Sequence, residues 1–446
     1  MKTMKKLLVL MLAAAMLLSI AACAATTNDP TPSTDPAPAA EEPTQTAEPS
    51  AEKESLEVWA ISSGTETDQY LRDFASAHPE VDYTITFYSD DDLKTQSKIA
   101  LDSGIVPDVF FGHAGADFSE YYSSGVLKDI TQLIKDNGTY DRIESGYYGP
   151  YTVDDKIYGY PEAVLTPWQS LYVNRDIFDA CGITEDPTTV DELIATCNTI
   201  RENGYDPIAI GDKDGWPAVI LCGDYYAQQT ADYGELNKIL TGEDTFPGTE
   251  VFRNAFATVV ELGQNGAYMS GFSSTDHNTA IQAFAAGQTA MLYCGSWWSS
   301  IAGGTDNGFT LDVIQLPLME GLTDNVSVQL CADIALLPTK DANESALGKF
   351  FDYISDGGYW TVMGNEYNSF TMVSSVNENL NLDPVFLKEP IIRQFDKPVL
   401  SPFFDNMFPA AVLTEMETAF QQAIAGEITV DQALENIQAV MDQNLG

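Results

Sequence analysis

Large aromatic side chains follow turns at which predicted strands end. Trp297 and Trp298 come after a predicted strand at 289–294 and a Gly-Ser turn, and Trp168 follows a proline that favours a loop. Flat rings of this kind pack on the apolar faces of a ligand, and such binding needs no covalent step. We therefore expect Trp297 and Trp168 to contact a ligand, whereas Trp298 fits the protein core equally well.

Short polar and charged side chains occupy similar positions beside other predicted strands. A turn and a helix start offer backbone N–H groups, and carboxylates form charge-assisted hydrogen bonds that are stronger than neutral ones. A structural role stays open for His113, and a hinge hydrogen bond stays open for Asp333. The candidates for ligand contacts are Ser62, Ser63 and Glu66 after the first strand, His113 and Asp117 after the third, Glu162 near Trp168, and Asp333 before a late apolar strand.

Residue patterns for covalent, metal or nucleotide chemistry do not occur. The chain has three histidines, and it lacks the H-E-x-x-H, G-x-S-x-G, Walker A and G-x-G-x-x-G motifs. No cysteine spacing suits zinc. Besides Cys23 there are five cysteines, which fit small buried side chains, with one disulfide left open as an alternative. We expect no catalytic residue, no metal and no cofactor.

Alternating strand and helix patterns position the candidate residues. The order strand, helix, strand, helix, strand is typical of an α/β body with a largely parallel sheet. Ligands of such folds lie beyond the carboxyl ends of the strands, which makes the loops at 62–66 and 112–117 functional candidates. The expected elements are strands at 56–61, 81–88 and 107–111, helices at 65–78 and from 90–92 onward, a capped helix from 188, a helix at 278–287, and helices within 410–445.

The acidic composition restricts the partners. Lys plus Arg number 21 and Asp plus Glu number 66, which is a formal charge of −45. Nucleic acids and anionic membrane surfaces are bound through clustered Lys and Arg, so neither is expected as a partner. The few basic residues also fit a neutral or cationic solute better than a multiply anionic one. The length of 446 residues favours two lobes or domains.

The first 54 residues are predicted to be a signal peptide followed by a tether. Residues 1–22 place lysines before an apolar run too short for an ordinary membrane span, as in a signal peptide. Residues 20–23 (IAAC) resemble the lipobox of bacterial lipoproteins, which implies a lipid on Cys23; a plain signal peptide is the alternative. Residues 23–54 are rich in proline and acids, so we expect a disordered tether. The chain would be anchored at the extracytoplasmic face of the cell membrane, on the exterior or in a periplasm.

Five motifs lie at residues 103–109, 157–161, 171–178, 284–291 and 295–297. Together they resemble one family, the extracellular solute-binding proteins of sugar-importing ABC transporters, of which maltose-binding protein is the best-known member. Residues 103–109 (SGIVPDV) look like the family's "SG-x-x-PDV" strand entry. Residues 157–161 (IYGYP) and 171–178 (LYVNRDIF) look like its "YG-x-P … LYYNKDLF" passage. Residues 284–291 (FAAGQTAM) and 295–297 (GSW) look like its "F-x-x-G-x-x-AM … GSW" passage. The resemblance covers most of the chain after the tether and is weak beyond about residue 375.

The resemblance implies an α/β, two-lobed periplasmic-binding-protein-like fold of type II, with a hinge and an interlobe ligand cleft. By similarity, residues 55–162 plus about 326–373 form the N-lobe, and residues 163–325 plus about 374–446 form the C-lobe. The implied function is that of a substrate-binding lipoprotein of an ABC importer. It would capture a carbohydrate, expected to be an oligosaccharide, by lobe closure and deliver it to permease subunits, and we expect it to act as a monomer without enzymatic activity.

A carbohydrate ligand agrees with the candidate residues. Its C–H patches pack on aromatic faces, and its hydroxyl groups need polar partners. By similarity, Trp297 matches the family's stacking tryptophan, and the family places polar ligand contacts near His113 and Asp117.

Two other hypotheses remain open. A secreted glycoside hydrolase needs two carboxylates at a set separation, which 66 acidic residues neither support nor exclude. The same fold could also bind a peptide or a polyamine. Thermal shifts and turnover of chromogenic glycosides distinguish these functions.

Overall fold

The structure is a computed structural model of the chain and describes residues 54–445 except 63, 332–333 and 397. These residues belong to one compact unit, Lys53–Gly446. The predicted signal peptide, Cys23 and the tether up to residue 53 lie outside the described residues. Within the described part of the chain, no helix is long and apolar enough to cross a membrane.

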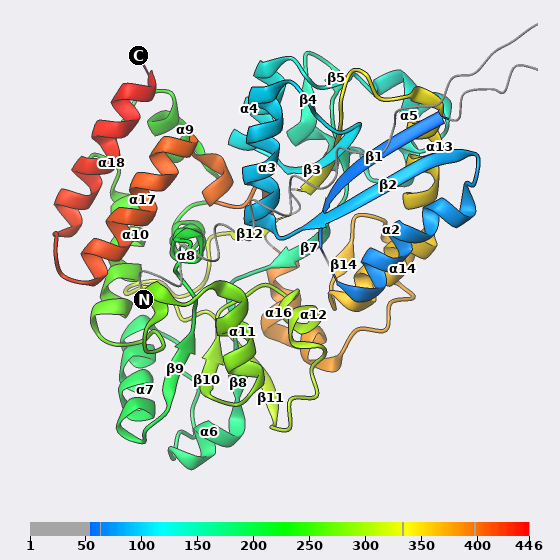
Figure 1. Cartoon of the computed structure of the whole chain (residues 1–446). Coiled ribbons are helices and arrows are strands. Elements are labelled where there is room, and N and C mark those ends of the chain that lie inside the picture. Colours follow the sequence, from blue (N-terminus) through cyan, green and yellow to red (C-terminus); the bar gives the residue numbers. More distant parts are fainter. Residues whose placement is uncertain (1–53, 63, 332–333, 397, 446) are drawn as a thin grey trace, which may run out of the picture. The chain divides into compact units, whose positions relative to one another are not determined.

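A five-stranded sheet, here named the first sheet, combines early and late segments of the chain (Figure 1). Its strands are β1 (Glu54–Ile61), β2 (Val81–Tyr88), β3 (Val109–His113), β6 (Tyr160–Pro161) and β13 (Ile334–Pro338). Their order is β2-β1-β3-β13-β6, and β13 runs opposite to the other four. Because side chains alternate along a strand, β1 buries Leu56, Val58 and Ala60 completely.

A four-stranded sheet, here named the second sheet, is formed by the middle of the chain. Its strands are β8 (Ser170–Asn174), β9 (Asp206–Ala209), β10 (Thr289–Leu292) and β11 (Leu311–Gln315). Their order is β11-β8-β10-β9, with β8 running opposite to the other three. The prediction of largely parallel sheets is therefore confirmed, with one reversed strand in each sheet.

The third sheet is made of segments that connect the other two. Its strands are β7 (Val164–Pro167), β12 (Val328–Cys331), β14 (Phe370–Thr371) and β15 (Pro398–Ser401), in the order β14-β7-β12-β15. The chain leaves the first sheet after β6, passes through β7, and enters the second sheet at β8. It returns from β11 through β12 to β13. A separate hairpin pairs β4 (Thr152–Val153) with β5 (Lys156–Ile157).

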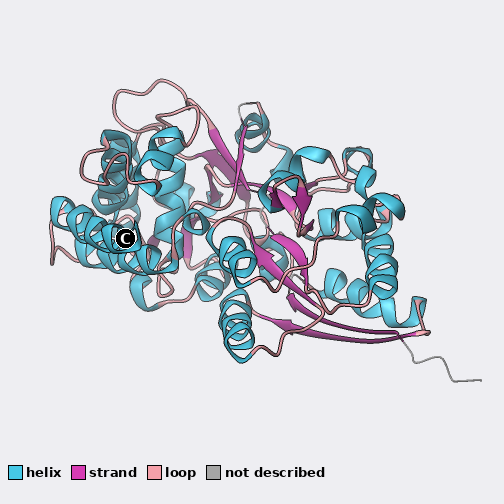
Figure 2. Ribbon diagram, turned by 90° about the horizontal axis from the view of Figure 1, so that it is seen from above, coloured by secondary structure: helices cyan, strands magenta, loops and turns pink. Residues whose placement is uncertain are grey.

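Helices flank the strands on both sides (Figure 2). The helices from the segments that build the first sheet are α2 (Thr65–Ala77), α3 (Asp90–Ser103), α4 (Ala116–Ser124), α5 (Thr131–Asp136), α13 (Glu344–Ile354), α14 (Gly357–Glu366) and α15 (Ser374–Asn377). The remaining α-helices are α6 (Arg175–Ala180), α7 (Val190–Glu202), α8 (Trp216–Ala227), α9 (Gly234–Leu240), α10 (Glu250–Gln264), α11 (His277–Ala285), α12 (Trp298–Ala302), α16 (Glu389–Ile392), α17 (Ala410–Ile424) and α18 (Val430–Leu445). Each of the two larger sheets has its own apolar core.

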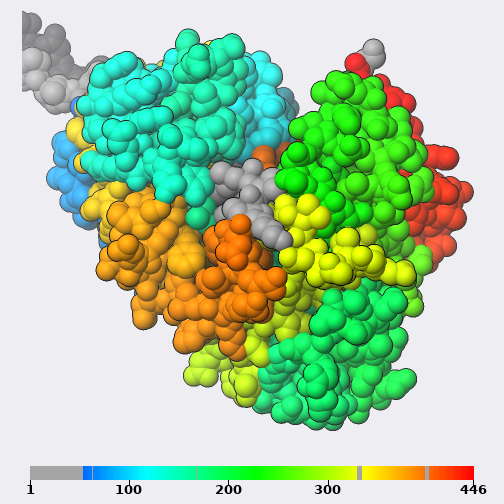
Figure 3. All heavy atoms as spheres, turned by 180° about the vertical axis from the view of Figure 1, so that it is seen from behind, coloured from blue at the N-terminus to red at the C-terminus, as the bar shows by residue number. Residues whose placement is uncertain are grey.

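Local signals in the sequence account for several helix boundaries. Ser89 accepts a hydrogen bond from the backbone N–H of Asp92, and the three acids predicted at a helix start lie in the first turn of α3. Thr189 and Glu192 form the predicted capping box of α7. The predicted C-terminal helices are α17 and α18, and Figure 3 shows the red C-terminal segment beside green residues that precede it by more than a hundred positions.

Strand β3 begins two residues later than the sequence predicts. A proline stands two residues before its start. The carboxylate of Asp108 accepts a hydrogen bond from the backbone N–H of Glu57 at 2.8 Å, so this N–H group of β1 is not available for pairing with the backbone of β3. The strand also ends two residues later than predicted, so His113 takes its last position instead of lying in the loop.

Four cysteines among the described residues are free thiols, and three of them are buried. The sequence favours cysteines that act as small buried apolar side chains. These four form no disulfide with one another. They are Cys181, Cys197, Cys222 and Cys294.

Candidate ligand-binding site

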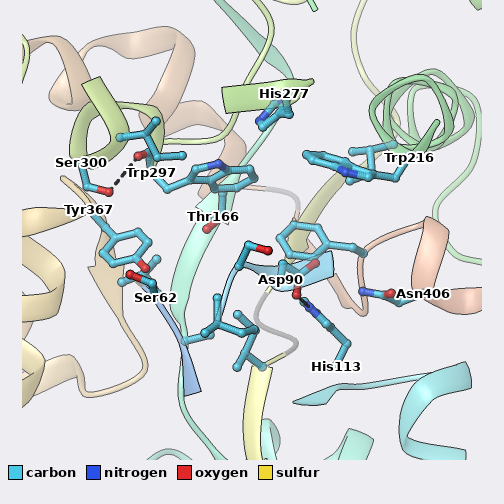
Figure 4. A pocket seen from close by; sticks show the side chains of 18 of the residues that line it. Ser62, Asp90, His113, Thr166, Trp216, His277, Trp297, Ser300, Tyr367 and Asn406 are labelled. Carbon is cyan, nitrogen blue, oxygen red and sulfur yellow. Dashed lines mark hydrogen bonds and ion pairs between the residues drawn. The ribbon is translucent and has the colours of Figure 1, made fainter. Parts of the chain in front are cut away.

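A cavity of about 270 Å³ lies where the ends of the three sheets meet (Figure 4). Side chains from the end of β1, from the start of α3 and from the end of β3 line it on one side. Side chains from β7, from the starts of α8 and α11, and from the turn before α12 line it on the other. Residues after β15 complete it. The carboxyl ends of parallel strands are the expected position for a ligand in this kind of fold.

Aromatic rings form one wall of the cavity, here named the aromatic wall. The ring of Trp297 lies edge-to-face against the ring of Trp168, with centroids 4.4 Å apart. Trp216 lies 6.3 Å from Trp168 and 4.4 Å from the imidazole of His277. Phe403 lies 5.8 Å from Trp168 and 6.0 Å from Trp297. Rings packed on one another at these distances restrain each other's orientation.

The turn before Trp297 contains glycine for a steric reason. A Cβ atom on Gly295 would lie 2.1 Å from the ring of Trp297 and 2.6 Å from the methyl group of Thr166. Real Cβ atoms do not approach other atoms so closely, so a larger residue would displace the ring. Gly295 therefore lets the indole of Trp297 fold back over its own turn, beside β7.

Hydrogen-bonding groups line the side opposite the aromatic wall. Nε2 of His113 lies 2.8 Å from Oδ1 of Asp90, and Nζ of Lys94 lies 3.1 Å from Oδ2 of the same carboxylate. Burial alone would raise the pKa of Asp90, but the charges of Lys94 and His113 hold it well below its ordinary value. The carboxylate is therefore ionised, and Lys94 balances its charge.

Glu162 is enclosed at the edge of the cavity with 2% of its surface exposed. The hydroxyl group of Tyr359 donates a hydrogen bond to its carboxyl group. Burial raises the pKa of Glu162 to about 8, which outweighs the lowering effect of this hydrogen bond. At pH 7 the side chain is therefore mainly a neutral carboxylic acid.

The structure brings five of the predicted contact residues to one cavity. Trp297 and Trp168 belong to the aromatic wall, although Trp168 is completely buried and not in an exposed loop as the sequence suggests. Ser62, His113 and Glu162 lie on the other sides. Ser62 also donates a hydrogen bond from its hydroxyl group to Asp68 at 2.7 Å.

Three other predicted residues lie elsewhere. Trp298 is fully buried beside Tyr172, so it takes the core position that the sequence leaves open. Glu66 is exposed, and its backbone N–H donates to the carboxylate of Glu366. Asp117 lines a neighbouring hollow.

Two further candidates, Ser63 and Asp333, lie outside the described residues.

Several residues of the cavity are missed by sequence reasoning. Asp90 is interpreted only as a helix cap, although it both starts α3 and faces the cavity. Trp216 and His277 stand at the starts of α8 and α11. α8 is the first helix after β9, so a helix start after a strand is the signal that could have found Trp216. Residues after β15 belong to the region in which the family resemblance is weak. The missed lining residues with polar or aromatic side chains are Ser89, Asp90, Lys94, Thr166, Trp216, His277, Asn278, Ser300, Tyr367, Phe403, Asp405 and Asn406.

Comparison with known proteins agrees with this fold. Residues 61–355 match the sequence pattern of the bacterial extracellular solute-binding proteins, and the chain belongs to this family. These are binding proteins, and an extracytoplasmic location fits the family. An ABC transporter extracellular-binding protein of Pyrococcus horikoshii is 26% identical over 371 residues, which cover 78% of this chain and 76% of that protein.

Two solved structures share the fold. A chitin oligosaccharide binding protein superposes with a TM-score of 0.76 at 21% identity, covering 88% of this chain and 98% of its own. A structure connected with xylan utilization by Caldanaerobius polysaccharolyticus gives a TM-score of 0.74 at 21% identity, covering 86% and 99% of the two chains. The protein therefore has the two-lobed type II solute-binding fold that its motifs predict.

Proposed function

We propose that the protein is the substrate-binding component of an ABC importer for a carbohydrate, which it holds in the cavity beside the aromatic wall. The observation that carries the proposal is the pairing of tryptophan rings, packed edge-to-face, with hydrogen-bonding side chains across one cavity. C–H faces of a sugar pack on the rings, while its hydroxyl groups bond to the polar side. The pattern agrees with relatives that are described by chitin oligosaccharide binding and xylan utilization.

The charge of the cavity favours a neutral solute. Lys94 is paired with the carboxylate of Asp90 and also interacts with the charge of Asp405, which lines the cavity too, and the carboxyl group of Glu162 is mainly protonated at pH 7. A polyamine would need unbalanced carboxylates, because buried cations require a paired charge. The volume of about 270 Å³ lies near the lower end of the ~300–1,000 Å³ that ligand pockets enclose. A short saccharide therefore fits better than a long one.

Lobe closure is the proposed mechanism of capture. We assign residues 55–162 plus about 326–373 to the N-lobe and residues 163–325 plus about 374–446 to the C-lobe, with the strands of the third sheet as the hinge. A ligand that contacts both lobes binds the closed state more tightly than the open state, and this difference in affinity drives closure. The closed lobes would then deliver the solute to the permease subunits.

The full chain should be stabilised by the saccharide that it binds. A ligand that binds only the native state raises the melting temperature by mass action, by several degrees at a hundredfold excess over Kd. Differential scanning fluorimetry with maltose, xylobiose, chitobiose and galactose checks this, with spermidine and a tripeptide as controls. A shift with spermidine or the tripeptide and none with any sugar would contradict the proposal.

Anchoring through Cys23 is the proposed tether. The lipobox-like residues 20–23 predict that cells incorporate labelled palmitate into the chain and that a Cys23→Ser variant incorporates none. Several acyl chains on one residue hold a protein at a membrane stably, whereas one chain does not. The wild-type chain should therefore sediment with membranes, and the variant should stay in the supernatant. Equal labelling of both chains would show that Cys23 is not the lipid site.

A further inference from the structure

His277 is a buried polar residue of the aromatic wall that the chemistry above does not use. It is 7% exposed and stands at the first position of α11. Its ring lies 4.4 Å from that of Trp216 and 6.4 Å from that of Trp297, centroid to centroid. Figure 4 shows the imidazole between these two indoles at the rim of the cavity.

The two nitrogens of this imidazole have different surroundings. Nε2 lies 3.4 Å from Sγ of Cys294, which is a fully buried free thiol. Nδ1 is shielded from solvent and has no hydrogen-bond partner among the described residues. A buried polar atom without a partner is destabilising, so a ligand or a water molecule is expected beside it.

The contact with Cys294 determines which nitrogen carries the proton. Burial keeps the pKa of the Cys294 thiol well above its ordinary value. The S–H group is therefore present, and Nε2 of His277 lies within reach of it as an acceptor. Burial also lowers the pKa of His277 to about 4, against the opposing charge of Asp276. The imidazole is thus neutral at pH 7, and a hydrogen bond from the thiol to Nε2 would place its single proton on Nδ1.

A second nitrogen of the aromatic wall is also buried without a hydrogen-bond partner among the described residues. Nε1 of Trp168 is shielded from solvent and has no hydrogen-bond partner among the described residues, although the ring lines the cavity. An indole N–H can only donate. Two buried nitrogens of the wall therefore lack a partner among the described residues, and as N–H donors they would be satisfied by an acceptor oxygen of a ligand that reaches them but not by a cationic nitrogen.

We propose that His277 is a specificity-determining residue of the site, held by the Cys294 thiol as the Nδ1–H tautomer so that it donates a hydrogen bond to an oxygen of the bound solute. The inference rests on the proposed carbohydrate function and narrows it to ligands with a hydroxyl or acetal oxygen at the aromatic wall. Because the donor is neutral, its contribution to affinity stays constant from about pH 5.5 to pH 8.

Nitrogen-15 NMR of the histidine side chains tests the tautomer without any ligand. The chain has only His78, His113 and His277, so the spectrum of a His277→Asn variant identifies the signals of the missing ring. The full chain should show His277 with a protonated Nδ1 and an unprotonated Nε2 at pH 6–8. In a Cys294→Ala variant, a mixture of both tautomers is expected. A protonated Nε2 in the wild-type chain would overturn the inference whatever the protein binds.

Isothermal titration with the sugar that gives the largest thermal shift among maltose, xylobiose, chitobiose and galactose tests the donor role. A His277→Phe variant should bind about 10-fold more weakly, and His277→Asn, which keeps a neutral N–H donor, should recover part of the loss. A His78→Phe variant, changed outside the cavity, should bind like the wild type. Equal affinity of all variants would overturn the inference and leave the proposed function intact. Binding of spermidine and of none of the sugars would overturn both.

Discussion

Replacing Trp297 with alanine should weaken saccharide binding by about 30- to 100-fold and leave the protein folded. The half-buried indole is the part of the aromatic wall that follows the Gly-Ser turn, and it lies edge-to-face on Trp168, which is fully buried. Central aromatic residues of binding sites commonly contribute 2 kcal/mol or more, and every ~1.4 kcal/mol is a factor of ten in Kd. Isothermal titration of the full chain measures the change.

A matched control separates stacking from a general effect of losing an indole. Trp59 lies in β1, is also partly buried, and does not line the cavity. Trp59→Ala should bind the saccharide normally, and Trp297→Phe should keep part of the affinity because a flat face remains. Circular dichroism should show the same helix content in all three variants. Normal binding by Trp297→Ala would place the ligand away from the aromatic wall.

Glu162 should make the stability of the protein fall as the pH rises from about 5 to 8, and Glu162→Gln should remove this contribution. His277, whose pKa burial lowers to about 4, opposes the fall below about pH 6.5 in both chains. In the native state burial raises the pKa of Glu162 to about 8, whereas the ordinary value is 4.5. Between these values the unfolded chain has released the proton and the native chain still holds it. The native state therefore binds more protons, and the free energy of unfolding decreases with pH. The stabilisation is complete below pH 4.5 and is lost as the pH approaches 8.

The expected slope of the free energy of unfolding against pH follows from the number of protons that the native state retains. One group that keeps its proton only in the native state contributes about 1.4 kcal/mol per pH unit inside the window. Asp224, a buried acid beside Tyr293 whose pKa burial also raises to about 8, adds to the same slope. Glutamine cannot ionise and still accepts the hydrogen bond of Tyr359.

Urea unfolding at four values between pH 5 and pH 8 measures the slope. The Glu162→Gln variant should show a slope smaller by about 1.4 kcal/mol per pH unit, while Glu427→Gln, a change at an exposed position, should leave the slope unchanged. Identical slopes for all chains would mean that Glu162 is ionised in the native state.

The sequence predicts correctly that Trp297 lines the cavity, but it does not distinguish the roles of Trp298 and Trp168, for a geometric reason. Because α12 begins at Trp298, consecutive side chains leave the helix in directions about 100° apart. Trp297 therefore faces the cavity, while Trp298 packs against Tyr172 and Phe284 in the core. Trp168 lies in the same wall but is enclosed by four other rings. Aromatic residues at a strand end indicate a site, but they do not show which ring touches the ligand.

A residue that fits the start of a helix can also line the cavity, and the sequence pattern shows only the first role. The acids at the start of α3 are good caps, and that explanation is sufficient for two of them. Asp90 differs because the fold brings it within 2.8 Å of His113, which lies 23 residues later at the end of β3. No local sequence pattern predicts this contact, because it depends on the pairing of β1 with β3.

Local patterns by themselves determined the class of fold, the alternation of strands and helices, the caps of α3 and α7, and the motifs that indicate the family. These features depend on side-chain periodicity and on backbone geometry over a few residues. The tertiary structure alone decided which polar side chains face the cavity and which aromatic rings are buried. The cavity joins residues as far apart as Ser62 and Asn406, and the direction of each side chain there is set by the packing of elements that are distant in the sequence.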